Sequence, residues 1–361
     1  VPWGIIVPVI TSTLIPGPYK VPNYYCDVKV LYTNTVPLAP YRGAGRPQAA
    51  LILNRLLDQA AEKLNMDPVE IRRRNLIKKD EFPYNTGLVS RDGSPQVYDS
   101  GNYEKLLRDV VDKGEYEKWK NLQKVYRQEG RYIGVGVAVA IENSGFGSFE
   151  GATVRIETDG GISVFTGAAT QGQAHETTLA QIAAEVFDTP IENVTVREGD
   201  TNHIAYGTGT FASRIATIAG TAVYNASQKV KEKALQIASC KLKTDIENLE
   251  LANGVVKLKN DPSKQMTFGE IALEARAFPP GTTFTYPVKP GLEETDYFAP
   301  KAAAISSMAD LAVVEIDPDT FQIQILNYTS IHDNGRILNP LVVKGQMLGG
   351  IANGIGNALY E

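Results

Sequence analysis

The chain has 361 residues, of which 43% are hydrophobic and 21% are charged, a composition typical of a globular protein too long for one small domain. Its formal net charge of −5 argues against nucleic acid or an anionic membrane as the main partner. The two cysteines, Cys26 and Cys240, indicate neither a disulfide framework nor a zinc site, and no apolar run reaches the roughly 20 residues of a membrane span. We therefore expect a cytoplasmic protein.

Both ends of the chain are unusual. It begins with Val1 in an apolar stretch, and it ends at Glu361 directly after the glycine-rich segment GGIANGIGNALYE. We expect the chain to be a piece of a longer polypeptide, or one chain of a split one.

In the first third of the chain, the stretch YYCDVKVLYTNT is expected to be extended and to lead to a tight turn at residues 41–46. A helix is predicted to begin at Pro47, since proline suits a first helical position and apolar residues follow at helical spacing. A short helix is predicted to begin at Pro68. Residues 78–101 are rich in Gly, Pro, Asp and Asn and are expected to form a loop, and residues 102–128 are expected to form one charged helix.

From residue 132 onward the pattern changes to strands. Strands are predicted at 132–142, 151–158, 160–167 and 193–198. A long helix is predicted from Ser213 to about Lys241, then a mixed insertion over 241–300, a hairpin over 309–331 around DPDTF, and a last helix after HDNGRILNP. The order strand, small-residue loop and helix occurs three times, which predicts a mixed α+β and α/β fold.

Four loops carry the candidate chemistry, and the first is PYRGAGRPQ at residues 40–48. Its glycines permit positive backbone φ or the close approach of a ligand to the main chain. Its arginines are forked donors that suit phosphate, carboxylate or an oxo group. The alternative is an ordinary turn with solvated arginines.

The second loop, TGAATQGQAH at residues 166–175, leads into an amphipathic helix. Backbone N–H groups at a helix start can hold an anion. The amides of Gln171 and Gln173 both donate and accept hydrogen bonds, as recognition of a heterocycle or a pyrophosphate requires. The alternative is a capped loop before a surface helix, with His175 as a capping or core histidine.

Two further loops have a similar composition. Residues 197–214 form a long polar loop with several small residues before a helix, which is a candidate anion cradle. Asp200 and His203 lie in it, but a metal site needs more ligands. Residues 332–350 offer carboxylate and amide groups from Asp333, Asn334, Asn339 and Gln346.

Several common catalytic patterns are absent. The sequence has no G-x-G-x-x-G after a strand and no Walker A lysine loop, which disfavours dinucleotide dehydrogenases and P-loop enzymes. It also lacks the G-x-S-x-G nucleophile motif, and no pair of carboxylates is spaced in a catalytic pattern.

Taken together, the loops resemble the large, molybdenum-binding subunit of the xanthine dehydrogenase, aldehyde oxidase and carbon monoxide dehydrogenase family. The matching words are YCDVKVLYTNT, YRGAGRPQAA, MDPVEIRRRN, TGAATQGQAHETTLAQI, DTNHIAYGTGTFASR and DNGRILNPLVVKGQMLGGIANGIG, which span nearly the whole chain. The resemblance implies an elongated, multi-domain molybdopterin-binding fold. Residues 1–130 would be the end part of a first molybdopterin-binding region, and residues 131–361 the start of a second.

The resemblance also implies which residues bind the cofactor, a molybdopterin cytosine dinucleotide that holds the molybdenum through its dithiolene. Gly172 and Gln173 would contact the metal and pterin end, and Gln171, Ala174 and His175 would continue this contact set. The other matching positions are Arg42, Gly43, Ala44, Gly45, Thr210, Phe211, Ala212, Ser213, Asp333, Asn339 and Gln346. No residue of the chain is expected to bind the metal directly.

Enzymes of this family are molybdenum hydroxylases, which oxidise a carbon centre with water as oxygen source. By resemblance, the electrons leave through [2Fe-2S] and FAD on partner subunits, and the complex, which also holds the remaining parts of the molybdenum subunit, is a dimer of heteromers. The family's catalytic glutamate lies in a Gly-Glu-Ala-Gly-like word beyond Glu361, and a Gly-Gly-Phe-Gly-Gly-like word is also missing. We therefore expect a central segment that contributes no catalytic residue and is inactive alone.

Two positions bear on the substrate. The copper-containing carbon monoxide dehydrogenases carry a cysteine where this chain has Gly43, which disfavours oxidation of carbon monoxide by that mechanism. Relatives that oxidise purines or aldehydes often place an aromatic ring at the position of Ala44, and Phe211 is expected to supply some of the lost apolar wall of the substrate pocket. Aldehydes, N-heterocycles and aromatic thioesters all stay open as substrates.

Two alternatives stand beside this interpretation. The chain could be a non-catalytic scaffold or remnant that binds no cofactor, but Gln173, Ser213 and Gln346 argue against decay, since a scaffold needs no such groups in these loops. An unrelated phosphate-binding enzyme would explain the single loops but not their joint order. Cofactor content distinguishes the first two interpretations.

Overall fold

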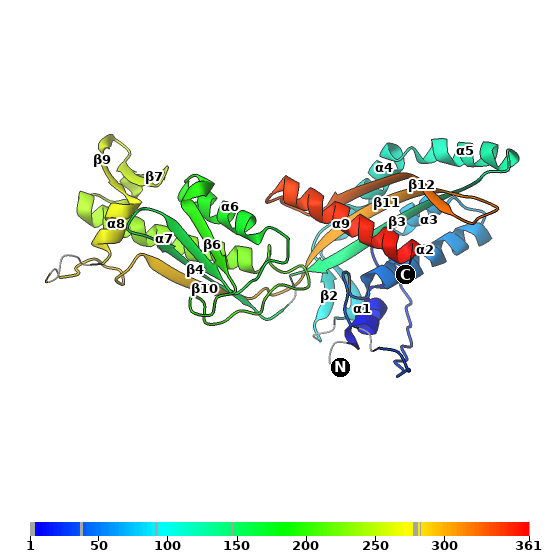
Figure 1. Cartoon of the computed structure of the whole chain (residues 1–361), viewed down its shortest axis with the longest axis horizontal. Coiled ribbons are helices and arrows are strands. Elements are labelled where there is room, and N and C mark those ends of the chain that lie inside the picture. The colour runs from blue at the N-terminus through cyan, green and yellow to red at the C-terminus, as the bar shows by residue number, and fades with distance from the viewer. Residues whose placement is uncertain are drawn as a thin grey trace. The chain divides into compact units, whose positions relative to one another are not determined.

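The computed structural model describes residues 4–36, 39–90, 93–145, 147–276, 281 and 283–360. The chain divides into two compact units, each assembled from separate stretches of sequence (Figure 1). The first unit comprises residues 1–143, 304–336 and 349–361, and the second comprises residues 144–303 and 337–348. The division into cofactor-binding regions at residue 130 stays a prediction.

The first unit is built on a sheet with the strand order β12-β11-β3. These strands are β3 (Tyr132–Ser144), β11 (Ala304–Ile316) and β12 (Ile323–Asp333). The helices of the unit are α1 (Ile6–Leu14), α2 (Arg46–Lys63), α3 (Pro68–Asn75), α4 (Tyr103–Lys113) and α5 (Tyr116–Gln128). Helix α4 packs against β11 and β12, and its Val110 is buried in one core with Leu311 and Val313 of β11.

Local signals explain the starts of two of these helices. Helix α2 begins at Arg46 with proline in its first turn, as predicted to within one residue. Helix α3 begins at Pro68, as predicted, and the Asp67 carboxylate accepts hydrogen bonds from the N–H groups of Val69 and Glu70. Such a cap satisfies donors that the helix itself leaves without partners.

Two predictions for residues 78–128 are wrong. The expected loop contains a short 3₁₀ helix η1 (Lys79–Glu81) and an antiparallel hairpin of β1 (Tyr84–Val89) and β2 (Pro95–Tyr98). Burial alternates along both strands, but over too few residues to stand out from the turn-forming composition. The expected single helix is two helices, because Glu115 adopts a left-handed φ of 55° directly after Gly114.

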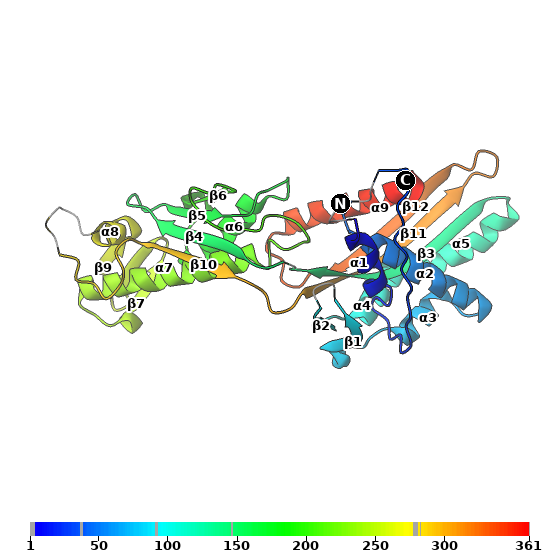
Figure 2. The ribbon, with the colours of Figure 1, turned by 90° about the horizontal axis from the view of Figure 1, so that it is seen from below.

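The second unit contains a sheet with the order β10-β4-β5-β6. Its strands are β4 (Glu150–Ile156), β5 (Ile162–Thr166), β6 (Val194–Glu198) and β10 (Glu293–Phe298). Helices α6 (His175–Phe187) and α7 (Ala219–Leu242) pack against one another and against this sheet (Figure 1 and Figure 2). Strands β5 and β6 are parallel and are connected through α6 and the short η2 (Ile191–Asn193).

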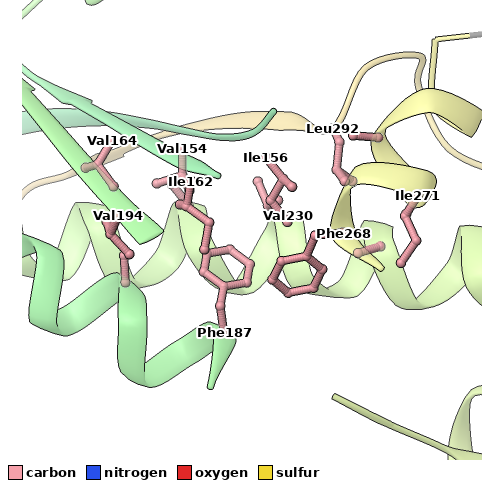
Figure 3. Packing of buried hydrophobic residues seen from close by; sticks show 14 of the residues in the cluster. Val154, Ile156, Ile162, Val164, Phe187, Val194, Val230, Phe268, Ile271 and Leu292 are labelled. Atoms are coloured by element: carbon pink, nitrogen blue, oxygen red, sulfur yellow. The ribbon is translucent and has the colours of Figure 1, made fainter. Parts of the chain in front are cut away.

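The core of the second unit lies between the sheet and helix α7. Strand residues such as Val154, Ile156 and Val164 lie close to Val230 of α7 in one buried cluster (Figure 3). Phe187 at the end of α6 meets Phe268 edge to face, with ring centroids 5.7 Å apart. The expected mixed insertion is η3 (Ile246–Asn248), a small sheet of β7 (Leu249–Ala252), β8 (Val255–Leu258) and β9 (Asp261–Thr267), and helix α8 (Phe268–Glu274).

The repeated order of strand, loop and helix is confirmed for β5 with α6, β6 with α7, and β12 with α9 (Pro340–Leu359). The hairpin around DPDTF is also confirmed, since β11 and β12 pair antiparallel. One helix boundary is wrong. Helix α7 begins at Ala219 and not at Ser213, because Ala212 and Ser213 both have a φ of 51°, which is incompatible with a right-handed helix.

Candidate cofactor-binding site

Two of the predicted loops leave the same edge of the sheet in the second unit. Strand β5 ends at Thr166, strand β6 ends at Glu198, and these two residues are direct partners in the parallel pairing. The loops that follow, at 167–174 and 199–218, therefore start side by side. In α/β sheets, ligands bind outside the carboxyl ends of parallel strands, so the sheet places both loops where such a site is expected.

The loop at 167–174 is closed by its own amides. The Gln171 N–H donates to Gln173 Oε1 at 2.6 Å, and Gln173 Nε2 donates to Gln171 Oε1 at 3.2 Å. Gly172 and Ala174 have φ values of 103° and 57°. Helix α6 then begins at His175 with no side-chain cap. The N–H groups of its first turn have no partner within the helix, so they remain suited to an anion.

The loop at 199–218 is joined to the first one through Thr210. Thr210 Oγ1 accepts a hydrogen bond from the Ala169 N–H at 3.2 Å, and the Thr210 carbonyl accepts one from Gln171 Nε2 at 3.5 Å. Two residues further, Ala212 and Ser213 are left-handed. Non-glycine residues in this conformation are strained by about 1–3 kcal/mol each, and successive turns of this kind can direct N–H groups toward an anion.

A buried polar cluster lies behind these loops. The Glu198 carboxylate accepts a hydrogen bond from the Thr170 N–H at 2.8 Å, and its other oxygen lies 3.4 Å from His175 Nδ1. His175 is only 6% exposed. Both atoms of this contact are buried. Within the part of the chain that the structure describes, Thr170 Oγ1 is also buried and has no hydrogen-bond partner, and such an atom calls for an additional polar group. A contact between His175 and the cofactor stays a prediction.

The fourth loop contributes Asn339 to this unit. Asn339 Nδ2 donates to Gln181 Oε1 of α6 at 3.0 Å, and Asn339 Oδ1 accepts from the Val342 N–H at 3.1 Å. Gln346 belongs to the same unit. Asp333 belongs to the other unit, where its carboxylate accepts a hydrogen bond from the Gly335 N–H at 3.2 Å.

The loop at 40–48 lies in the first unit and is held firmly. Gly43, Ala44 and Gly45 have φ values of 95°, 46° and 96°. Arg46 lies 2.8 Å from the Glu142 carboxylate and donates to the Gly43 carbonyl at 3.2 Å. Arg46 therefore stabilises the loop itself, and of the two arginines only Arg42 keeps its role as a predicted ligand contact.

Arg42 lies against the glycines of α9 in the same unit. A Cβ on Gly349 would lie 3.1 Å from Arg42 Nη1, so glycine leaves room for the guanidinium at this place.

The two residues of the predicted substrate pocket lie in different units. Ala44 packs against the core of the first unit. Phe211 is 46% exposed in the second unit, and its ring lies 5.1 Å from the guanidinium carbon of Arg214. A shared pocket of Ala44 and Phe211 stays a prediction.

Sequence reasoning missed three functional candidates, Glu150, Glu198 and Arg214. Glu198 holds the loop at 167–174 through the Thr170 N–H, while Glu150 and Arg214 hold the loop at 199–218. The two glutamates are 48 positions apart, and only the pairing of β4, β5 and β6 brings them to one edge. The sequence carries no local signal for this.

Across the described ranges, no three His, Cys, Asp or Glu side chains gather into a group that could hold a metal ion. None of the helices in those ranges has the length and apolar character needed to cross a membrane. Cys26 and Cys240 are both exposed free thiols. Glu361 lies outside the described residues.

A further titratable cluster lies on one face of β11 and β12 in the first unit. Tyr328 donates to Asp310 Oδ1 at 3.3 Å, and Ser330 Oγ lies 2.8 Å from His332 Nε2. Burial raises the pKa of the Asp310 carboxyl and lowers the pKa of the His332 imidazole. The charged form of each group is therefore disfavoured in the folded chain.

Asp310→Asn is expected to change how stability depends on pH. Because the folded pKa of Asp310 lies above its unfolded value, the wild type loses stability as the pH rises from about 4 through the folded pKa. The asparagine variant lacks this loss, so its melting temperature should rise relative to that of the wild type as the pH increases over that range. Thermal unfolding of both chains at a series of pH values measures the difference, and a difference independent of pH would contradict the prediction.

Two family models of the molybdopterin cofactor-binding domain match the chain, one over residues 1–76 and the other over residues 109–361. The gamma subunit of the 6-hydroxypseudooxynicotine dehydrogenase complex of Paenarthrobacter nicotinovorans is 34% identical over 352 residues, which cover 98% of this chain and 44% of the relative. The carbon monoxide dehydrogenase large chain of Hydrogenophaga pseudoflava is 34% identical over 361 residues, covering 96% of this chain and 44% of the relative.

A solved structure has the same fold. Quinoline 2-oxidoreductase of Pseudomonas putida 86 superposes with a TM-score of 0.82 at 32% identity, covering 98% of this chain and 45% of that one. The chain thus spans less than half the length of these relatives. Both the domain matches and the fold agree with the resemblance found in the loops. The chain belongs to the molybdopterin-binding large subunits of the xanthine dehydrogenase, aldehyde oxidase and carbon monoxide dehydrogenase family.

Proposed function

We propose that this chain holds a molybdopterin cofactor in its cytosine dinucleotide form, as part of a molybdenum hydroxylase. The observation that carries the proposal is the pair of loops at 167–174 and 199–218, bonded to one another through Thr210. They leave adjacent parallel strands and combine left-handed backbone, amide side chains and an uncapped helix start. A ligand with phosphates and a heterocycle rich in donors and acceptors needs this set of groups.

The residues present fit such a cofactor. Backbone N–H groups at the start of α6 suit a phosphate or a pterin oxygen, and the positive end of the helix dipole favours negative charge there. Among the described residues the buried Thr170 Oγ1 has no hydrogen-bond partner, and we expect it to form one with the cofactor or with a water beside it. Gln171, Gln173, Asn339 and Gln346 would bind its heterocycles, and residues Thr210–Ser213 would line the metal end. Arg42–Gly45 and Asp333 complete the proposed set from the first unit.

The proposed reaction is oxidation of a carbon centre in an aldehyde or an N-heteroaromatic compound, with water as the oxygen source. When bound, the cofactor supplies a metal that accepts the electrons and directs oxygen to the substrate. The chain's own residues bind and orient the cofactor and contribute to an apolar wall through Phe211. No catalytic base is assigned to this chain.

The names of two relatives support an N-heterocyclic substrate, since one is a quinoline 2-oxidoreductase and the other acts on 6-hydroxypseudooxynicotine. Gly43 stands where a copper-binding cysteine would be expected for carbon monoxide oxidation. We propose that electrons pass to [2Fe-2S] and FAD on partner subunits in the cytoplasm. With the remaining parts of the molybdenum subunit, these would form a dimer of heteromers.

Elemental analysis of the natively purified complex tests the proposal. We expect about one molybdenum per chain, as one cofactor-binding constellation requires, together with iron, a released cytosine nucleotide and no copper. Absence of both molybdenum and pterin from a complex that contains iron would contradict the proposal and favour a scaffold.

Gln173→Ala is expected to lower molybdenum content or turnover on the order of 10- to 100-fold, the range seen when a residue that supports a metal site is removed. The fold should persist, because the bonds of the Gln173 amide to other described residues lie within its own loop. Gln236→Ala is a matched control, since this glutamine of α7 bonds to Glu232 on the same helix. Metal analysis and turnover of the complex measure the effect, and equal values for both variants would count against the assignment.

A further inference from the structure

A buried ion pair lies behind the loop at 199–218. The side chains of Glu150 and Arg214 are both 0% exposed, and Arg214 Nη1 donates to Glu150 Oε2 at 2.6 Å. Glu150 is the first residue of β4, and Arg214 follows the left-handed Ser213. A buried ion pair adds little stability compared with apolar residues of similar volume, so its presence here points to another purpose.

Both partners bind the loop's backbone as well as one another. The Glu150 carboxylate accepts hydrogen bonds from the N–H groups of Thr208 at 3.2 Å and Gly209 at 3.0 Å. Arg214 donates to the Gly209 carbonyl at 2.6 Å and to the Phe149 carbonyl at 2.5 Å. The ion pair thus connects the stretch from Thr208 to Arg214 to the start of β4 by hydrogen bonds.

The backbone packs closely around the ion pair. A Cβ on Gly207 would lie 2.5 Å from Glu150 Oε1 and 2.6 Å from the Gly167 Cα. A Cβ on Gly147 would lie 2.9 Å from Arg214 Nε. Glycine at these positions lets three backbone segments close around the ion pair, so the loop and the pair have one joint arrangement.

We propose that Glu150 and Arg214 are positioning residues, which set the backbone of residues 210–213 for the cofactor. This inference rests on the proposed function. The fork of the guanidinium fixes directions that a lysine cannot, and the segment it fixes contains the strained Ala212 and Ser213. The pair acts through the loop and does not itself contact the cofactor.

Arg214→Lys in the natively purified complex is the first test. Lysine keeps the charge, so the complex should assemble, but it cannot hold Glu150 and both carbonyls at once. Hydrogen exchange of the Thr208 and Gly209 amides should accelerate about tenfold or more, as loss of a charge-assisted hydrogen bond implies. The molybdenum content or the kcat of the Arg214→Lys complex should also fall. Lys233→Arg is the matched control, because Lys233 is also buried in an ion pair of this unit, with Glu294, and this exchange likewise keeps the charge.

The double variant Glu150→Gln with Arg214→Met separates positioning from charge balance. It removes both charges together, so its thermal stability should stay near that of the wild type. The protection of the Thr208 and Gly209 amides and the molybdenum content should stay below those of the wild type. The inference would be overturned if the double variant regained both wild-type amide protection and wild-type molybdenum content. It would also be overturned if Arg214→Lys showed the hydrogen-exchange rates and the molybdenum content of the wild type. If wild-type amides are protected but the wild-type complex holds neither molybdenum nor pterin, the proposed function fails, and the role toward a cofactor fails with it.

Discussion

Replacing Phe187 by alanine is expected to lower the free energy of unfolding of the second unit by about 3–5 kcal/mol, the range found for buried phenylalanines. Phe187 is 0% exposed and closes the core at the end of α6. Truncation removes its edge-to-face contact with Phe268 and leaves a cavity among strand residues such as Ile162 (Figure 3). Close-packed cores refill such cavities only in part.

Urea denaturation of the chain, followed by far-UV circular dichroism, measures this loss. Phe321→Ala provides the control, because Phe321 is 76% exposed in the turn between β11 and β12. Surface substitutions of this kind usually change stability by less than about 0.5 kcal/mol. Equal midpoints for the two variants would show that Phe187 is not packed as described.

The second large effect is expected for Gly45→Ala in the first unit. A Cβ on Gly45 would lie 2.3 Å from the Val7 carbonyl oxygen and 2.9 Å from Thr11 Oγ1, and the φ of Gly45 is 96°. Overpacking costs about 1–3 kcal/mol, and a left-handed alanine costs roughly 1–2 kcal/mol more. Helix α1 must therefore shift away from the loop, and Thr11 loses its hydrogen bond to the Gly45 carbonyl.

Gly335→Ala separates the two causes. Gly335 also has a positive φ, of 65°, but a Cβ there would meet nothing within 4 Å. Gly335→Ala should therefore lose only the free energy that the left-handed backbone costs an alanine, roughly 1–2 kcal/mol. Thermal unfolding of both variants measures the difference. If the two variants lose equal stability, then the close approach of α1 to the loop does not contribute.

The sequence was most informative where a local preference decides the structure. Proline in the first helical turn predicted the starts of α2 and α3 to within one residue, since this effect acts over only a few positions. The glycines of YRGAGRPQ were expected to permit either positive φ or the close approach of a ligand, and Gly43 and Gly45 adopt positive φ. The apolar periodicity of α6 predicted the helix that crosses from β5 to β6.

Local sequence preferences were misleading where contacts with a neighbouring element set the backbone conformation. Small residues at 212–213 looked like a helix start, but contacts of Arg214 with Glu150 and Phe149 hold this stretch in a left-handed turn. The hairpin of β1 and β2 was missed because its inward-facing residues are few, although Tyr98 of β2 is buried in the core of the first unit. Its composition alone is that of a loop.

For the candidate site, short segments of sequence were enough to predict the groups that a ligand would meet: the amides of Gln171 and Gln173 and small residues that permit left-handed backbone. The order of these segments along the chain pointed to the family. Which segments lie together depends on the folded chain. The register of β5 on β6 places Thr166 beside Glu198, and β4 brings Glu150 to the same edge. Contacts between residues tens of positions apart depend on sheet register and packing, and no local pattern encodes them.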